Sequence, residues 1–210
     1  MKVPSMNDQI YERLRHEISI GVILPGEKTT LREIASKFGV STTPVREAIR
    51  RLQAENFLQV EQRHISIRKL SKLEITQIFT IRKRLETLAV EWAVPNIRPI
   101  DRKNLRLILK HMDHHSLPNN EWQQLNRTFH LQMYQYANSQ KLCQSIENVW
   151  DSVSPYLHIY TYGMDYYEKS QIEHYKMLDL IEERKLEEIT QLIIDHLEDT
   201  QQIIMESLAQ

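Results

Sequence analysis

Glycine and proline are scarce in this chain, and their scarcity restricts the folds that the chain can adopt. Only four glycines and seven prolines occur among 210 residues, so few positions favour tight turns or helix breaks. The stretches between these positions are rich in Leu, Glu, Lys and Gln, which are good helix formers. The composition therefore predicts a mainly α-helical protein.

Two further features of the composition narrow the class of protein. Cys143 is the single cysteine, so no disulfide can form within the chain and a reducing compartment is expected. The N-terminal sequence MKVPSMNDQIYERL lacks the apolar segment of a signal peptide, and no run of about 18 apolar residues occurs elsewhere. We therefore expect a cytoplasmic protein that has no membrane partner.

Charge is divided unequally along the chain. Residues 1–70 contain 12 Lys and Arg against 8 Asp and Glu, and residues 71–210 contain 15 against 20. A basic N-terminal part joined to an acidic C-terminal part suggests that the first part has a polyanionic partner.

Three helices are expected in the N-terminal part. Apolar residues recur at helical spacing over residues 7–20, where Asn7 or Asp8 can cap the helix. A second, short helix follows Thr30 and ends at Gly39. The third lies in the stretch GVSTTPVREAIRRL, which starts at Gly39.

This third helix has an unusual start. Ser41 or Thr42 can cap it, and Pro44 lies in its first turn, where the missing N–H costs no hydrogen bond. Its apolar stripe leaves the arginines largely on the outer side. The stripe consists of Val45, Ala48, Ile49 and Leu52.

Two short strands are expected after this helix, over residues 57–60 and 65–68, and they form a β-hairpin wing.

The second and third expected helices are separated by a tight turn and so form a helix-turn-helix. A recognition helix of that kind enters the DNA major groove with its N-terminal residues leading. Hydroxyls at its start can bind phosphate, and Arg46, one turn further on, can donate two hydrogen bonds to guanine.

The alternative interpretation is that these arginines form a solvated surface. The agreement of cap, proline, spacing and hairpin favours DNA binding instead. The residues predicted to contact DNA are Arg32, Ser41, Thr42, Thr43, Pro44, Arg46, Arg50, Arg63 and His64.

The segment PGEKTTLREIASKFGVSTTPVREAIRRL resembles the winged helix-turn-helix of the GntR family of bacterial transcription regulators. The resemblance covers most of residues 7–68 and implies DNA contacts from the second helix, the start of the third helix and the wing. Thr42 stands where the family usually has Arg, and the wing sequence RHIS lacks the usual glycine. We take residues 1–69 as the DNA-binding domain.

Residues 70–210 are expected to form an all-α bundle of about six helices. The first helix opens at Ser71 and ends before Pro95, and its apolar surface is broader than one stripe. That breadth suggests contact both with the rest of the domain and with another chain. Further helical patterns cover about 100–113, 119–136, 139–158, 166–183 and 186–208.

Three histidines in the bundle share helix faces with apolar residues. Asn126 and His130 lie at positions i and i+4, and His174 and His196 lie on the faces of two later helices. Three inward-facing imidazoles can surround one divalent cation. Taken singly, each is more often a hydrogen-bonded core histidine, so spacing leaves both interpretations open.

The segments IFTIRKRLETLAVEWA, LNRTFH, EHYKMLDLI and IIDHL resemble the FadR-type branch of the GntR family and its FCD effector domain. In many members of that branch an Asp-x-x-x-His pair and two later histidines hold a divalent metal that takes a carboxylate of the effector. The resemblance places His130, His174 and His196 at three of these positions, and Asn126 replaces the aspartate.

A neutral amide adds no negative charge. The sequence therefore predicts weaker binding of Zn, Ni or Mn, or direct binding of an anionic effector by the histidines. The predicted effector-binding residues are Arg82, Asn126, His130, His174 and His196. For Arg82, a structural pair with Glu86 at i+4 is favoured over a role in the cavity.

The sequence favours one function over two others. The favoured one is a homodimeric transcription factor, acting as a repressor, that binds double-stranded DNA at a palindromic operator and responds to a small organic acid. A metallohydrolase would need a general base near the metal, and Glu173 and Asp195 each point about 100° away from the neighbouring histidine. The third hypothesis is a dimeric DNA-binding protein that has no metal or effector response.

Overall fold

The structure is a computed structural model, and the chain in it divides into two compact units, Met1–Ser71 and Lys72–Gln210. Each unit is described by itself. The residues that the structure describes are 5–20, 22–61, 63–114, 117–161 and 164–208.

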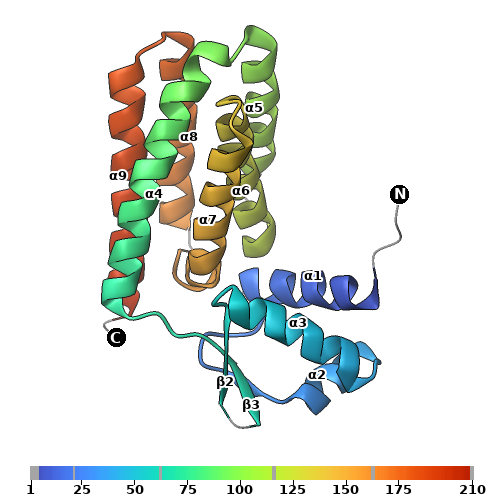
Figure 1. Ribbon diagram of the computed structural model, residues 1–210. Coiled ribbons are helices and arrows are strands. Elements are labelled where there is room, and N and C mark those ends of the chain that lie inside the picture. The colour runs from blue at the N-terminus through green and yellow to red at the C-terminus, as the bar shows by residue number, and fades with distance from the viewer. Residues whose placement is uncertain (1–4, 21, 62, 115–116, 162–163, 209–210) are drawn as a thin grey trace. The chain divides into compact units, whose positions relative to one another are not determined.

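The N-terminal unit combines three helices with a small antiparallel sheet (Figure 1). Its helices are α1 (Met6–Ser19), α2 (Leu31–Phe38) and α3 (Thr42–Ala54). Its strands are β1 (Lys28–Thr29), β2 (Leu58–Glu61) and β3 (His64–Ile67), in the order β1-β3-β2. The predicted winged helix-turn-helix is confirmed, with one strand more than expected.

The additional strand is β1. Lys28 pairs with Ser66, and Thr29 pairs with Ile65, so β1 lies along the outer edge of β3. A strand of two residues has no periodicity that the sequence could reveal. It forms because β3 is already paired with β2 and presents a second edge.

The helix caps agree with the sequence in α2 and differ in α1. Thr30 and Glu33 form the expected capping box, and Gly39 ends α2 in the left-handed conformation with φ of 65°. The prediction that Asn7 or Asp8 caps α1 is wrong, because Ser5 is the cap. Its hydroxyl accepts a hydrogen bond from the Asp8 N–H, and Asp8 accepts one from the Ser5 N–H in return.

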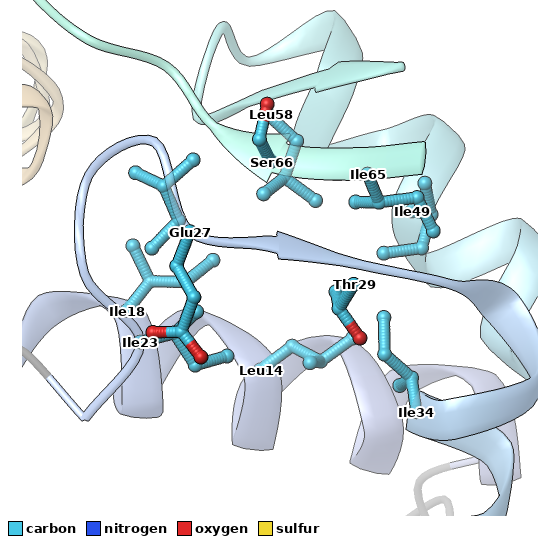
Figure 2. Close-up of a pocket in the computed structure, with 11 residues that line it drawn as sticks. Leu14, Ile18, Ile23, Glu27, Thr29, Ile34, Ile49, Leu58, Ile65 and Ser66 are labelled. Carbon is cyan, nitrogen blue, oxygen red and sulfur yellow. The ribbon is translucent and has the colours of Figure 1, made fainter. Parts of the chain in front are cut away.

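The core of the N-terminal unit lies between the sheet and the helices. Figure 2 shows its centre, where side chains from α1, α2, α3 and the strands surround a hollow of about 10 Å³. A space of that size holds at most about one water molecule, so the packing is close. The buried side chains include Leu14, Ile18, Ile34, Val45, Ile49, Leu52, Ile65 and Ile67.

The C-terminal unit is a bundle of long helices, as the sequence predicts, and its described residues contain no strand (Figure 1). Between the first two helices lies the 3₁₀ turn η1 (Val94–Asn96), which contains Pro95. The helices are α4 (Lys72–Ala93), α5 (Pro99–Met112), α6 (Asn119–Gln135), α7 (Gln140–Tyr160), α8 (Met164–Glu182) and α9 (Leu186–Ser207).

Helix α4 packs against α6, α7 and α9 and has two different faces. Its inner face buries apolar residues such as Phe79 and Val90, together with the charged pair Arg82 and Glu86. On the outer side Leu73 is 66% exposed, and Ile81 and Trp92 are each 47% exposed.

Within the described residues, no helix is long and apolar enough to span a membrane.

Candidate functional site

A hollow of about 700 Å³ opens on the N-terminal unit beside α2, α3 and the wing. Four of the arginines predicted to contact DNA line it, and we call this surface the arginine hollow. Its arginines are Arg32, Arg46, Arg50 and Arg63, and its other lining residues are Thr30, Leu31, Ile49, Gln53, Val60 and Ile65.

Most of these arginines form no ion pair with another residue that the structure describes. Within the part of the chain that the structure describes, Arg32, Arg46 and Arg63 form no ion pair, whereas Arg50 contacts Glu47 at 3.0 Å. Arg51 takes no part in the hollow, because its guanidinium lies 3.6 Å from the centre of the Tyr11 ring. Unpaired, exposed guanidinium groups that share one concave surface are suited to bind a polyanion.

The other residues predicted to contact DNA lie outside the hollow lining. Ser41 is the N-cap of α3 but makes no capping hydrogen bond, so its hydroxyl is available to a ligand. Thr43 is exposed and Pro44 half-buried in the first turn of α3, where backbone N–H groups have no partner within the helix. Thr42 is half-buried, and His64 is exposed at the start of β3.

Sequence reasoning assigned no DNA contact to Gln53, a polar residue of the arginine hollow. Gln53 lines it, three residues after Arg50 and seven after Arg46, so all three lie on one face of α3. That spacing was the available signal, and a glutamine amide can hydrogen-bond to base edges.

The three histidines singled out in the sequence meet inside the C-terminal unit. His130 on α6, His174 on α8 and His196 on α9 are all buried, and one ring nitrogen from each lies within 4.8 Å of the others. The Nε2 atoms of His130 and His174 are 3.1 Å apart. We call these three residues the histidine centre.

The outer hydrogen bonds of the histidine centre assign its tautomers, beginning with His130. The Tyr134 hydroxyl donates to Glu86 Oε2 at 2.7 Å, and its oxygen lies 3.3 Å from His130 Nδ1. A tyrosine hydroxyl has one proton to donate, so it can only accept from His130. Nδ1 of His130 therefore carries the proton, and Nε2 presents a lone pair to the centre.

The other two histidines have acceptors on their outer nitrogens as well. The Gln171 amide nitrogen donates to Leu109 O and Asp113 Oδ1, both at 2.7 Å, which turns the Gln171 carbonyl oxygen toward His174 Nδ1 at 3.3 Å. Glu173 Oε2 lies 2.6 Å from His196 Nδ1. Both Nδ1 atoms therefore donate, and both Nε2 atoms are left with lone pairs.

Three converging lone pairs fit a cation. Two nitrogen ligands on a tetrahedral ion at about 2.0–2.1 Å lie roughly 3.3 Å apart, close to the 3.1 Å between His130 and His174. Burial lowers the pKa of His130 and of His174 well below the ordinary value of 6.5, and the other histidines of the centre add to the effect. Both rings are therefore neutral at pH 7, as metal ligands must be.

Two buried polar atoms nearby lack a hydrogen-bond partner among the described residues, namely Asn126 Oδ1 and Arg82 Nη1. Asn126 lies one helical turn before His130, where the sequence places a fourth ligand. Arg82 forms the expected pair with Glu86, with 2.7 Å between Nε and Oε1, and its guanidinium lies 4.2 Å from the centre of the Trp150 ring. Unsatisfied buried atoms are costly, so a ligand that bonded to both atoms would stabilise the site.

The structure also reveals residues that sequence reasoning missed or placed differently. Tyr134 lies four residues after His130, and that spacing was the available signal. Glu173 points away from its neighbour His174, as expected, and instead accepts from His196 on the adjacent helix. Asp195 accepts from Gln191. Both candidate bases for a hydrolase are therefore engaged in other hydrogen bonds.

Comparison with known families finds two family models that match the chain. Residues 6–64 match the model of the bacterial regulatory proteins of the gntR family, and residues 77–199 match the FCD domain. The chain belongs to the GntR family. Its FCD match covers all three residues of the histidine centre, and its gntR match covers every arginine of the hollow.

Known GntR proteins resemble this chain along most of its length. The helix-turn-helix regulator McbR of Escherichia coli K12 is 33% identical over 183 residues, which cover 85% of this chain and 82% of McbR. The repressor GlaR of the same strain is 23% identical over 210 residues, which cover 95% of this chain and 96% of GlaR. The solved structure of E. coli McbR/YncC has a TM-score of 0.84 at 26% identity, covering 98% of this chain and all of that one.

These findings give the function in outline. The chain is a helix-turn-helix transcription regulator with an N-terminal gntR domain and a C-terminal FCD domain, and it is not an enzyme.

Proposed function

We propose that the chain is a homodimeric cytoplasmic repressor whose binding to a palindromic operator is controlled by a small carboxylate in the C-terminal domain. Residues 1–69 bind DNA, and residues 70–210 dimerise and bind the effector. Two N-terminal domains related by a two-fold axis would contact two half-sites of a palindrome. GlaR, a relative of similar length, is named a repressor, which favours the same direction of control here.

The arginine hollow supports the DNA-binding part of this proposal. Arg46 projects from the second turn of α3 and has no ion-pair partner among the described residues. We assign it to base contact in the major groove, where a bidentate contact with guanine discriminates by about 1–3 kcal/mol. We assign Arg32, Arg63 and His64 to the backbone or the minor groove, and Ser41, Thr42, Thr43, Pro44 and Arg50 to the phosphates beside the recognition helix.

Arg46→Ala tests this assignment. Operator half-sites are first selected from random duplexes with the wild-type protein, and binding is then measured by fluorescence anisotropy at fixed salt. Arg46→Ala should lose at least about tenfold in specific affinity while non-specific affinity changes little. The matched control is Arg13→Ala, since Arg13 lies on α1 outside the hollow, where it contacts Glu17 at 3.7 Å and the Phe38 ring at 4.6 Å. Unchanged operator affinity in Arg46→Ala would remove α3 from the recognition role.

The single observation that supports effector control most strongly is the convergence of three imidazole lone pairs beside two unsatisfied buried atoms. His130, His174, His196 and Asn126 would hold a divalent Zn, Ni or Mn ion. Such an ion, when bound, supplies open coordination positions for a carboxylate. Arg82 Nη1 can donate to a second carboxylate oxygen, which would satisfy a nitrogen that is otherwise buried without a partner.

The effector proposal is tested by operator release. Wild-type protein on its selected operator is titrated with a panel of small carboxylates, with and without zinc. One carboxylate should release the DNA from the wild type but not from His174→Ala. His111→Ala, an exposed histidine on α5, should respond as the wild type does. Release that persists in His174→Ala would exclude the histidine centre as the effector site.

A further inference from the structure

The histidine centre is connected to helix α4 by a chain of buried hydrogen bonds. Arg82 and Glu86 lie on α4, Glu86 accepts from the Tyr134 hydroxyl, and that hydroxyl accepts from His130. The four side chains are at most 3% exposed, so water does not compete for these bonds. In the low dielectric of the interior such bonds are stronger than at the surface.

This connection distinguishes His130 from the other two histidines. Among the described residues, His174 bonds outward to Gln171, which is tied to Leu109 and Asp113 at the end of α5. His196 bonds outward to Glu173 on α8. The outer bond of His130 alone leads to α4, which starts at Lys72, five residues after strand β3 ends at Ile67.

We propose that Tyr134 and Glu86 are positioning residues that couple the ligand state of His130 to helix α4, and so to the chain segment that enters the DNA-binding domain. The inference rests on the proposed function and deepens it. His130 Nε2 would hold a cation at the centre, and the His130 ring would then be fixed. The Nδ1–H of that ring then holds the Tyr134 hydroxyl, whose proton points at Glu86. Glu86 in turn holds Arg82, so α4 is bound more firmly when the centre is filled.

The direction of each hydrogen bond matters to this coupling. If the Tyr134 hydroxyl turned its proton toward His130, the ring would carry its proton on Nε2 and would lose the lone pair that faces the centre. Glu86 prevents that rotation because an ionised carboxylate can only accept. Glu86 on α4 therefore selects, through the Tyr134 hydroxyl, the tautomer of His130 on α6 that can bind a metal. Outer partners of metal-bound histidines act in the same way.

The test uses the full-length protein and zinc alone. Tyr134→Phe keeps the ring and removes the hydroxyl, and Tyr11→Phe is its matched control. The buried Tyr11 hydroxyl also donates to a carboxylate at 2.7 Å, that of Glu55, but lies in the N-terminal unit and contacts no residue of the histidine centre. Zinc affinity is measured by competition with a chromogenic chelator. Hydrogen exchange of the α4 amides is measured without zinc and at saturating zinc.

The wild type and Tyr11→Phe should gain exchange protection in α4 when zinc binds. Tyr134→Phe should bind zinc about 10- to 100-fold more weakly, and its α4 should gain no protection even when zinc is saturating. Glu86→Gln serves as a second variant if Tyr134→Phe folds poorly, and it should lose the α4 response while retaining a hydroxyl beside His130.

Wild-type affinity together with wild-type α4 protection in Tyr134→Phe and Glu86→Gln would overturn the coupling and leave the proposed function standing. Failure of the wild type itself to bind zinc would instead refute the metal site of the proposed function.

Discussion

The two fully buried histidines of the centre should make the metal-free C-terminal domain sensitive to mild acid. Burial lowers the pKa of His130 and of His174 below the value of 6.5 that an exposed imidazole has. In the unfolded chain both rings take up a proton as the pH falls through 6.5, whereas in the folded chain they stay neutral. The unfolded state then binds more protons, so the free energy of unfolding decreases as the pH falls.

The size of this decrease in the free energy of unfolding follows from the number of buried imidazole rings. Each histidine contributes a loss of about 1.4 kcal/mol per pH unit below 6.5, until the pH reaches its folded-state pKa. Two rings together should lower the free energy of unfolding by about 2.7 kcal/mol between pH 7.5 and pH 5.5. This loss ends below the folded-state pKa values, where both states are protonated.

The assay is urea unfolding of metal-stripped protein followed by tryptophan fluorescence. All three tryptophans, Trp92, Trp122 and Trp150, lie in the C-terminal unit, so the signal reports on that unit. His174→Asn should lose about half of the pH dependence. The control His16→Gln, an exposed histidine in the N-terminal unit, should leave it unchanged. A free energy of unfolding that stays constant between pH 7.5 and 5.5 would refute the assignment of two neutral, buried rings.

Two further predictions concern the metal and the dimer. Asn126→Asp should tighten zinc binding by at least about tenfold, because a carboxylate adds one negative charge at ligand distance. The control is Asn148→Asp, which changes an exposed residue on α7. An unchanged zinc dissociation constant in Asn126→Asp would remove Asn126 from the site. Ile81→Glu should convert the proposed dimer to a monomer in sedimentation velocity, because Ile81 lies on the exposed apolar side of α4 between Leu73 and Trp92. A dimer that persists in Ile81→Glu at micromolar concentration would place the interface elsewhere.

The helices and the wing could be predicted from the sequence because their signals are local. Caps, apolar spacing and turn residues act over a few positions, and the predicted helix ends agree with the observed ones to within about two residues. The cap of α1 was misplaced because Ser5 and Asp8 form a reciprocal box, in which Asp8 is the partner rather than the cap. Strand β1 was missed because only tertiary pairing with β3 creates it.

The candidate site also has one part that local sequence signals predict and one part that depends on contacts between helices. The inward direction of His130, His174 and His196 follows from helical spacing, which is local. The direct outer partners of His130 and His174 lie on the same helices as those histidines. The groups that orient these partners, Glu86 for Tyr134 and Asp113 for Gln171, come from outside those helices. Glu173, the partner of His196, also lies on a different helix. Contacts between helices depend on packing angles that a single sequence does not contain. The tautomers, and with them the preference for a cation, become visible only when the helices are assembled.

The three lone pairs that converge in the bundle also bear on how samples of this protein should be prepared and compared. If the histidine centre binds metal as proposed, nickel released from an affinity column would bind there, and a chelating buffer would remove it. Two preparations with one sequence but different purification histories would then differ in melting temperature, crystal growth and operator occupancy. Native mass spectrometry of each batch, which weighs the intact protein together with what it holds, therefore belongs before any functional measurement.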